Sequence, residues 1–200
     1  MYGFGGEAAK CALFSAILVA LIVTDAETMI LPDELTYGGA LAGFALAWLV
    51  PMPARFALIV AGRVSDPRFL SLTEAALGAG VTAGSLLALA KVYKLLRHRE
   101  GMGLGDVKMM LFAGSFLGLW KALLVMMVGS ALGSAVGVAW IVIAFIATGR
   151  RSWPLSHRIA VAQYIFSRRQ LPFGAFLGVS AILVALFGEA FLSWYMHLGV

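Results

Sequence analysis

The sequence predicts an all-α, polytopic integral membrane protein with about six transmembrane helices. Of its 200 residues, 62% are hydrophobic and only 12% are charged, and its mean hydropathy is +0.94, which places it outside the soluble globular class. Because a spanning helix needs about 20 residues, little chain remains for a soluble domain, and residues 1–200 are expected to form one transmembrane domain. Six uncharged stretches separate the charged residues: Cys11–Thr24, Leu35–Ala54, Ala75–Ala90, Met109–Trp120, Ala122–Gly149 and Gln170–Gly188.

The two shortest stretches, the first and the fourth, each adjoin an aspartate. Neither reaches the length of about 20 residues that a span needs, so the first helix is expected to extend through Asp25 and the fourth to begin near Asp106. The first helix can also extend backwards past Lys10, whose long side chain can snorkel to the membrane surface. Both carboxylates are therefore expected at similar depth near the same membrane face.

Residues 55–73 are expected to form a loop, because the apolar run Phe56–Gly62 is too short to cross a bilayer. The segment Arg151–Gln170 alternates basic and apolar residues at helical spacing, which fits either a helix on the membrane surface or a basic loop. Glycines four residues apart are expected to let helices approach closely in lipid, as architecture and not chemistry: Gly39 and Gly43, Gly80 and Gly84, Gly114 and Gly118, Gly129, Gly133 and Gly137, Gly174 and Gly178.

Basic residues are distributed unequally between the two faces that six alternating spans define. If Asp25 and Asp106 share a face, ten lysines and arginines lie with them and five lie opposite. The positive-inside rule then assigns the face of the aspartates to the cytoplasm, with both termini outside. In a membrane protein, this rule and anionic headgroups explain the net charge of +5 better than nucleic acid does. The five opposite residues are Lys10, Arg55, Arg63, Arg68 and Lys121.

Asp25 and Asp106 are the strongest candidates for a functional site. An ionisable side chain at this depth is costly to bury and by default marks function, unless a basic partner neutralises it. The alternative is that both are ordinary helix-end acids. Asp106 would then cap a helix N-terminus, and Asp25 would belong to an acidic loop together with Glu27, Asp33 and Glu34. The chemistry of helix ends alone does not favour a functional site over ordinary helix-end acids.

Short motifs surround both aspartates. Asp25 begins an Asp-x6-Pro-Asp motif, and Asp106 ends a Gly-x-Gly-Asp motif. Two further features follow in order, Lys108 and Leu171-Pro-Phe-Gly174. Together the four features resemble the type IV prepilin peptidase family, which comprises polytopic bacterial membrane aspartyl proteases of the Gly-x-Gly-Asp type. A lone Gly-x-Gly-Asp would be weak, because glycines before a helix also serve phosphate loops, but neither phosphate-loop motif is completed here.

The resemblance implies that Asp25 and Asp106 form a catalytic dyad. Two carboxylates held close do not both ionise easily, so they share one proton: one acts as base toward a water and the other as acid toward the substrate carbonyl. Because a coupled pair titrates as a unit, the two roles are not assigned to individual residues. No metal or other cofactor is expected, in keeping with three histidines dispersed along the chain.

The same resemblance implies a prepilin, pseudopilin or Flp-type precursor as substrate, whose short basic leader is removed at the cytoplasmic face of the bacterial inner membrane. Gly103 and Gly105 lack Cβ atoms and are expected to allow a tight turn and close approach of the substrate backbone, unless they form a plain flexible loop. The acids Glu27, Asp33, Glu34 and Glu100 are expected to attract the basic leader, unless they are merely solvated charges. Lys108 is expected to lower the pKa of the aspartate pair, to bind a carboxylate, or only to anchor its helix at the membrane surface.

One departure from the family concerns cysteine. Many members carry paired Cys-x-x-Cys motifs ahead of the first catalytic aspartate, associated with N-methylation of the mature pilin. Cys11 is the only cysteine in this sequence. The sequence is therefore expected to represent a short, peptidase-only form without methyltransferase activity.

Other classes of function fit parts of the sequence. A small transporter or channel could use Asp25 and Asp106 as a proton or cation relay, but this does not explain why the motifs occur together. A lipid-modifying enzyme could bind a divalent cation through the acids of residues 25–34, although such sites usually need a denser carboxylate cluster. A presenilin-type intramembrane protease shares Gly-x-Gly-Asp but accounts less well for Asp-x6-Pro-Asp.

Overall fold

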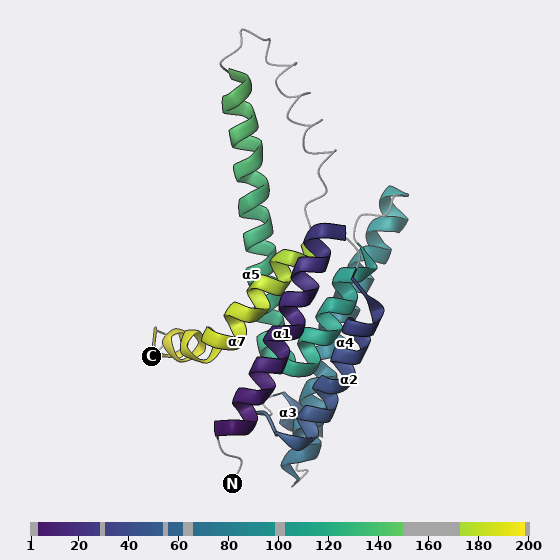
Figure 1. The fold of residues 1–200 in the computed structure, drawn as a ribbon, viewed down its shortest axis with the longest axis vertical. Helices are drawn as coiled ribbons and strands as arrows, with labels where there is room; N and C mark the ends of the chain where they lie inside the picture. Colours follow the sequence, from purple (N-terminus) through teal and green to yellow (C-terminus); the bar gives the residue numbers. More distant parts are fainter. Residues whose placement is uncertain are drawn as a thin grey trace.

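A computed structural model describes residues 4–28, 31–53, 56–61, 66–98, 103–149 and 173–198. Every element in these ranges is an α-helix, as the sequence predicts: α1 (Phe4–Thr28), α2 (Asp33–Leu49), α3 (Ala57–Ala61), α4 (Pro67–Arg97), α5 (Leu104–Gly149) and α7 (Phe173–Leu198) (Figure 1). Four of them contain segments long and apolar enough to cross a membrane: Gly5–Thr28, Pro67–Arg97, Leu104–Ile143 and Phe173–Phe191. The expected surface helix at Arg151–Gln170 lies outside the described residues.

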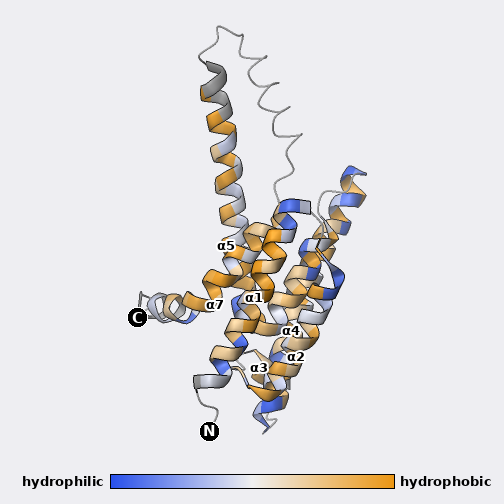
Figure 2. Cartoon of the chain, in the orientation of Figure 1, coloured by the Kyte–Doolittle hydropathy of each residue, from blue (hydrophilic) through white to orange (hydrophobic). Residues whose placement is uncertain are grey.

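Hydrophilic residues gather at the ends of the helices, while the lengths of α1, α4, α5 and α7 are largely apolar (Figure 2). The helix α1 continues through Asp25 to Thr28. The helix α5 begins at Leu104, which places Asp106 in its first turn. Both extensions confirm that the two helices include their neighbouring aspartates. With 25 residues α1 reaches spanning length, whereas α5 turns at Gly118 before its first part reaches that length.

The prediction of a loop over residues 55–73 is wrong at both ends. Ala57–Ala61 forms the short helix α3, and α4 already begins at Pro67. The side chain of Asp66 accepts a hydrogen bond of 2.9 Å from the backbone N–H of Arg68. An aspartate cap followed by proline at the first helical position is a standard helix start, so these two residues begin a helix and do not interrupt one.

The helix α5 consists of two arms that meet at Gly118. The backbone of Gly118 has φ 75° and ψ 175°, a combination that is essentially restricted to glycine. The sequence places the boundary between the fourth and fifth stretches at the only charged residue there, Lys121, whereas the turn lies three residues earlier. The first arm, Leu104–Leu117, packs among α1, α2 and α4, and the second arm, Leu119–Gly149, packs against α7.

Glycines set how closely the first arm approaches its neighbours. A Cβ atom on Gly39 of α2 would lie 2.7 Å from the ring of Phe112, and Gly78 and Gly114 bring the backbones of α4 and α5 into direct contact. These contacts support the expected role of small residues in lipid. The expectation is wrong for Gly80 and Gly84, which have open space beside them. The helix face of α4 that packs on α5 therefore carries Gly78.

Candidate active site

Two buried aspartates occupy one end of the helix bundle. Asp25 lies in the last turn of α1 and is 5% exposed, and Asp106 lies in the first turn of α5 and is 8% exposed. Asp106 is the third residue of its helix, so the alternative in which it serves as the N-cap is wrong. A carboxylate is costly to bury without a partner, which makes the surroundings of both side chains informative.

The first turn of α7 brings the two aspartates together. A Cβ atom placed on Gly174 would lie 2.7 Å from Oδ2 of Asp25 and 3.3 Å from Oδ1 of Asp106. The backbone N–H of Ala175 donates a hydrogen bond of 2.9 Å to the same Oδ2 of Asp25. Gly174, expected to serve only as architecture, thus provides the space that both carboxylates occupy. Its neighbours Leu171 and Pro172 lie outside the described residues.

Helix N-termini provide the electrostatic environment of the pair. Asp106 lies within the first turn of α5, and Asp25 receives an N–H group from the first turn of α7. The exposed N–H groups and the dipole at a helix N-terminus stabilise negative charge. In the described part of the chain, Asp25 accepts one backbone hydrogen bond and Asp106 accepts none. The pair therefore retains lone pairs that can accept a proton or a water.

An ion pair fastens α2 to α5 beside Asp106. Lys108 donates a short hydrogen bond to Asp33, and its ammonium group lies 5.4 Å from the centre of the Tyr37 ring. The structure thus gives Lys108 the carboxylate of Asp33 as its partner, and joins two residues that the sequence assigns separately to substrate binding. The pair is half-exposed, with 26% of the Lys108 side chain and 59% of the Asp33 side chain accessible.

The two motif glycines differ in their surroundings. Gly105 lies within α5, where a Cβ atom would come 2.9 Å from the side chain of Leu31. The expected tight turn is wrong for this residue, because its missing side chain admits Leu31 and its φ is not positive. Gly103 precedes α5 and has open space around it. Glu27, in the last turn of α1, is exposed at the same end of the bundle.

Glu74 is a buried carboxylate that the sequence analysis missed. It is 2% exposed, and its two oxygens accept backbone N–H groups from Phe56 and Ala57 at 2.9 Å and from Leu119 at 3.3 Å. These bonds hold the start of α3 and the second arm of α5 just after Gly118. The available signal was that Glu74 directly precedes the uncharged stretch Ala75–Ala90, which is also shorter than the length of about 20 residues that a span needs. An acid beside a short stretch is the signal that identified the aspartates.

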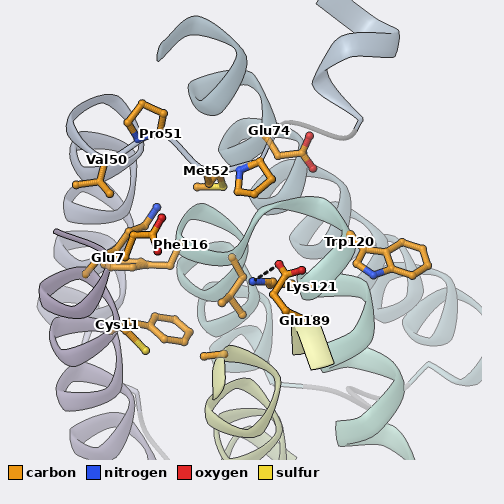
Figure 3. Close-up of a pocket in the computed structure, with 15 residues that line it drawn as sticks. Glu7, Cys11, Val50, Pro51, Met52, Glu74, Phe116, Trp120, Lys121 and Glu189 are labelled. Atoms are coloured by element: carbon orange, nitrogen blue, oxygen red, sulfur yellow. Dashed lines mark ion pairs between the residues drawn. The ribbon is translucent and has the colours of Figure 1, made fainter. Parts of the chain in front are cut away.

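A cavity of about 460 Å³ lies at the other end of the bundle (Figure 3). Lys10 and Lys121 are among its lining residues, and Lys121 forms an ion pair of 2.8 Å with Glu189. Lys10 precedes Asp25 by fifteen residues in one helix, which corresponds to roughly 22 Å along the axis. The cavity is therefore separate from the aspartate pair. Within the described ranges, no three His, Cys, Asp or Glu side chains gather where they could share a metal ion.

The architecture defines a multi-pass helical membrane protein with a buried pair of carboxylates where three helix ends meet. The sequence profile of the type IV leader peptidase family matches residues 12–138. The chain belongs to this family. No solved structure gives a significant match.

Curated relatives carry the same family name. The prepilin leader peptidase/N-methyltransferase of Aeromonas hydrophila is 29% identical over 199 residues, which cover 97% of this chain and 54% of the relative. The protein of that name from Neisseria gonorrhoeae is 34% identical over 137 residues, 68% of this chain and 42% of the relative. That from Pseudomonas aeruginosa is 27% identical over 197 residues, 98% of this chain and 55% of the relative. The chain spans about half the length of the curated relatives it matches.

Proposed function

We propose that this protein is a membrane aspartyl endopeptidase that removes the short basic leader from type IV prepilin-like precursors, with residues 1–200 acting as one peptidase domain. The observation that carries the proposal is the position of Gly174, where an added Cβ atom would lie 2.7 Å from Asp25 Oδ2 and 3.3 Å from Asp106 Oδ1. Three motifs that are far apart in the sequence thereby meet at one point. The name of the relatives, prepilin leader peptidase/N-methyltransferase, agrees with the proposed leader peptidase activity.

In the proposed mechanism, Asp25 and Asp106 share one proton. The ionised carboxylate accepts a proton from water as the water oxygen attacks the scissile carbonyl carbon, and the protonated carboxyl donates its proton to the carbonyl oxygen. Collapse of the tetrahedral intermediate then breaks the C–N bond, and the amine leaves with a proton from the pair. The Ala175 N–H group holds Asp25 in place without occupying its remaining lone pairs.

The proposed topology has six spans: α1, α2, α4, the two arms of α5, and α7. The helix α2, with 17 residues, and the still shorter first arm of α5, Leu104–Leu117, are both short for a bilayer. A local thinning of the membrane would accommodate them. The excess of basic residues on the side of the aspartates supports a cytoplasm-facing site in the bacterial inner membrane. On this assignment, the cavity that contains Lys10 and Lys121 faces the outer side.

The substrate's leader is proposed to lie over the exposed acids of α1 and α2. Glu27 lies in the last turn of α1 and Glu34 in the first turn of α2, and both are exposed at the same end of the bundle as the aspartate pair. Asp33, between them in the chain, already pairs with Lys108. The two glutamates are therefore the acids that attract a basic leader, by long-range steering more than by tight contact.

The test is cleavage of a synthetic precursor in liposomes, followed by mass spectrometry with chelator present. The precursor has a short lysine-containing leader ending in glycine, followed by an apolar helix of about 20 residues, long enough to span the bilayer. Wild-type protein is expected to cut it once, at the leader boundary. Asp25→Asn and Asp106→Asn are each expected to abolish the cut, because neutral asparagine supplies neither the base nor the acid.

A matched control separates loss of chemistry from loss of charge. Asp66→Asn removes an aspartate at the exposed start of α4, where asparagine caps a helix equally well, and it is expected to cleave at the wild-type rate. Wild-type protein that is folded and inserted but cuts no precursor would overturn the proposal. Proton flux through the same liposomes would then favour the transporter.

A further inference from the structure

A groove of about 430 Å³ lies between the second arm of α5 and the first turns of α7. Small residues of α5, including Gly133 and Gly137, form its floor together with Ile141, and Phe173 and Phe176 of α7 form its opposite wall. The lining is mostly apolar. On α5 these positions follow one another at helical spacing, so the groove runs along a single face of the helix.

The groove lies where the axes of α5 and α7 diverge. At Gly129, a Cβ atom on α5 would lie 2.9 Å from the side chain of Leu177, so the two helices are in close contact there. One turn later, at Gly133, the nearest atom is a ring carbon of Phe173 at 3.6 Å. The separation therefore widens toward the start of α7, while the second arm of α5 continues beyond it (Figure 1).

The groove adjoins the aspartate pair directly. Phe173 and Phe176 line the groove, and between them in the same turn Gly174 and Ala175 contact Asp25. One helical turn thus presents one face to the carboxylates and another to the groove. A chain whose peptide bond lies at the carboxylates can enter the groove within a few residues.

The two flanks of the aspartate pair have opposite character. On the side of α1 and α2 lie the exposed acids Glu27 and Glu34. On the side of α5 and α7 the groove is apolar, and exposed Val138 and Ile141 extend that character along α5. Figure 2 shows the same division, with hydrophilic residues at the junction of α1 and α2 and apolar residues along the second arm of α5.

We propose that this groove binds the apolar helix that follows the scissile bond of the substrate, while the leader lies on the acidic side. This inference rests on the proposed function and adds the direction in which the substrate crosses the site. Charge and apolarity on the two flanks match a substrate that is basic before the cleaved bond and apolar after it. The small residues on the floor allow a substrate helix to approach the backbone of α5 closely.

Site-specific photo-crosslinking tests the proposal with a matched pair of positions. Ile141 lines the groove, and Ile143 lies two residues later on the opposite face of the same helix; both are exposed. A photoreactive residue is placed at each position in the Asp106→Asn protein in liposomes, and the synthetic precursor is added. Cleavage by the wild-type protein is measured first with the same precursor.

The expected result is a crosslink to the apolar part of the precursor from position 141 and at least tenfold less from position 143. Two results would contradict the proposal that the groove binds the substrate helix and leave the proposed function standing. One is equal crosslinking from both positions. The other is a crosslink from position 141 to lipid or to the protein's own chain while precursor is present. Absence of wild-type cleavage would overturn both proposals.

A second pair of variants keeps the test decisive if the photoreactive proteins fold poorly. Gly137→Leu fills the groove, whereas Ala139→Leu adds the same side chain on the opposite face. The groove variant is expected to raise KM for the precursor about tenfold, which is the effect of losing roughly 1.4 kcal/mol of binding, and the control is expected to leave KM unchanged. Equal KM values for the two variants would contradict the proposal.

Discussion

Buried carboxylates lie at both ends of the bundle, and they differ in how fully their oxygens are satisfied. Glu74, beside the turn of α5, accepts three backbone N–H groups. At the other end, Asp25 accepts one such group, and Asp106 accepts none from the described residues. Both sites remove charge from water, yet only Glu74 recovers most of the lost hydration through the backbone.

The difference separates a carboxylate that holds the fold from carboxylates that remain available for chemistry. Glu74 replaces its water shell with donors from α3 and α5, so it is expected to stabilise their positions. The aspartate pair keeps its lone pairs free and gives up stability in return, as expected of functional sites. Burial alone does not distinguish the two cases. The number of hydrogen-bond donors around each carboxylate does.

Neutralising the aspartates should produce the largest loss of activity with no loss of stability. Asp25→Asn and Asp106→Asn are expected to lower the cleavage rate by about 10²–10⁴-fold, the usual contribution of a general acid or base. The Tm of the detergent-solubilised protein should not fall, because an asparagine at position 25 would still accept the Ala175 N–H bond and a buried charge is relieved. A large drop in Tm would place the aspartates with Glu74 as structural groups.

Removing the Glu74 side chain should produce the reverse pattern. Glu74→Ala leaves three N–H groups without their acceptor and is expected to cost at least about 3 kcal/mol of unfolding free energy, given the usual penalty for each buried group. Unfolding in mixed micelles measures this cost. Cleavage per folded molecule should stay near the wild-type value. Glu74→Gln, which keeps one acceptor oxygen, should be milder; equal effects of the two variants would argue against backbone satisfaction as the cause.

Adding one methyl group at Gly174 should disturb the pair without unfolding the protein. Gly174→Ala places a Cβ atom 2.7 Å from Asp25 Oδ2, so the carboxylate must move aside. A displacement of this kind is expected to slow cleavage by up to about 10²-fold. Gly80→Ala in α4 is the matched control, because its Cβ atom would enter open space. Similar rates for the two variants would show that the position of Asp25 is not critical.

Exchanging the charges of Lys108 and Asp33 should have the smallest effect. Each single reversal breaks a partly exposed ion pair, which typically contributes about 0.2–1 kcal/mol, and is expected to slow cleavage only a few-fold. The double variant Asp33→Lys with Lys108→Asp should recover most of the lost rate if the pair positions α2 against α5. A double variant no better than either single would instead indicate that Lys108 or Asp33 contacts the substrate.

Local signals in the sequence predict the helices and the aspartates but not their contacts. Apolar stretches identify the helical segments, and the shortage of apolar residues beside Asp25 and Asp106 indicates that both helices extend past them. The role of Gly174 depends on the distant residues Asp25 and Asp106, and Glu74 accepts N–H groups from residues 17, 18 and 45 positions away. The periodicity of apolar residues within one helix does not predict which other helix packs against it. These contacts are therefore known only from the packed structure. The catalytic roles of the aspartates stay a prediction.

The turn of α5 is a second feature that the sequence does not predict. A lysine in an apolar region suggests the end of a span, because charge is costly in lipid. In the structure Lys121 lies within the second arm and forms an ion pair with Glu189 of α7, so the helix has no need to end there. The reversal is made by Gly118, whose conformation could be identified only from the backbone.

The single-glycine turn couples the two arms of α5 during biosynthesis. A helix enters the bilayer with its backbone hydrogen bonds satisfied within itself, and the turn at Gly118 provides no polar loop that could wait on one face while one arm crosses alone. On the proposed six-span topology, the two arms therefore enter the membrane together as a hairpin. Lys121 lies directly after this turn in the chain, and its ion-pair partner Glu189 is synthesised later. On the same proposed topology, Lys121 reaches the outer end of the bundle before α7 supplies the carboxylate of Glu189 that pairs with it.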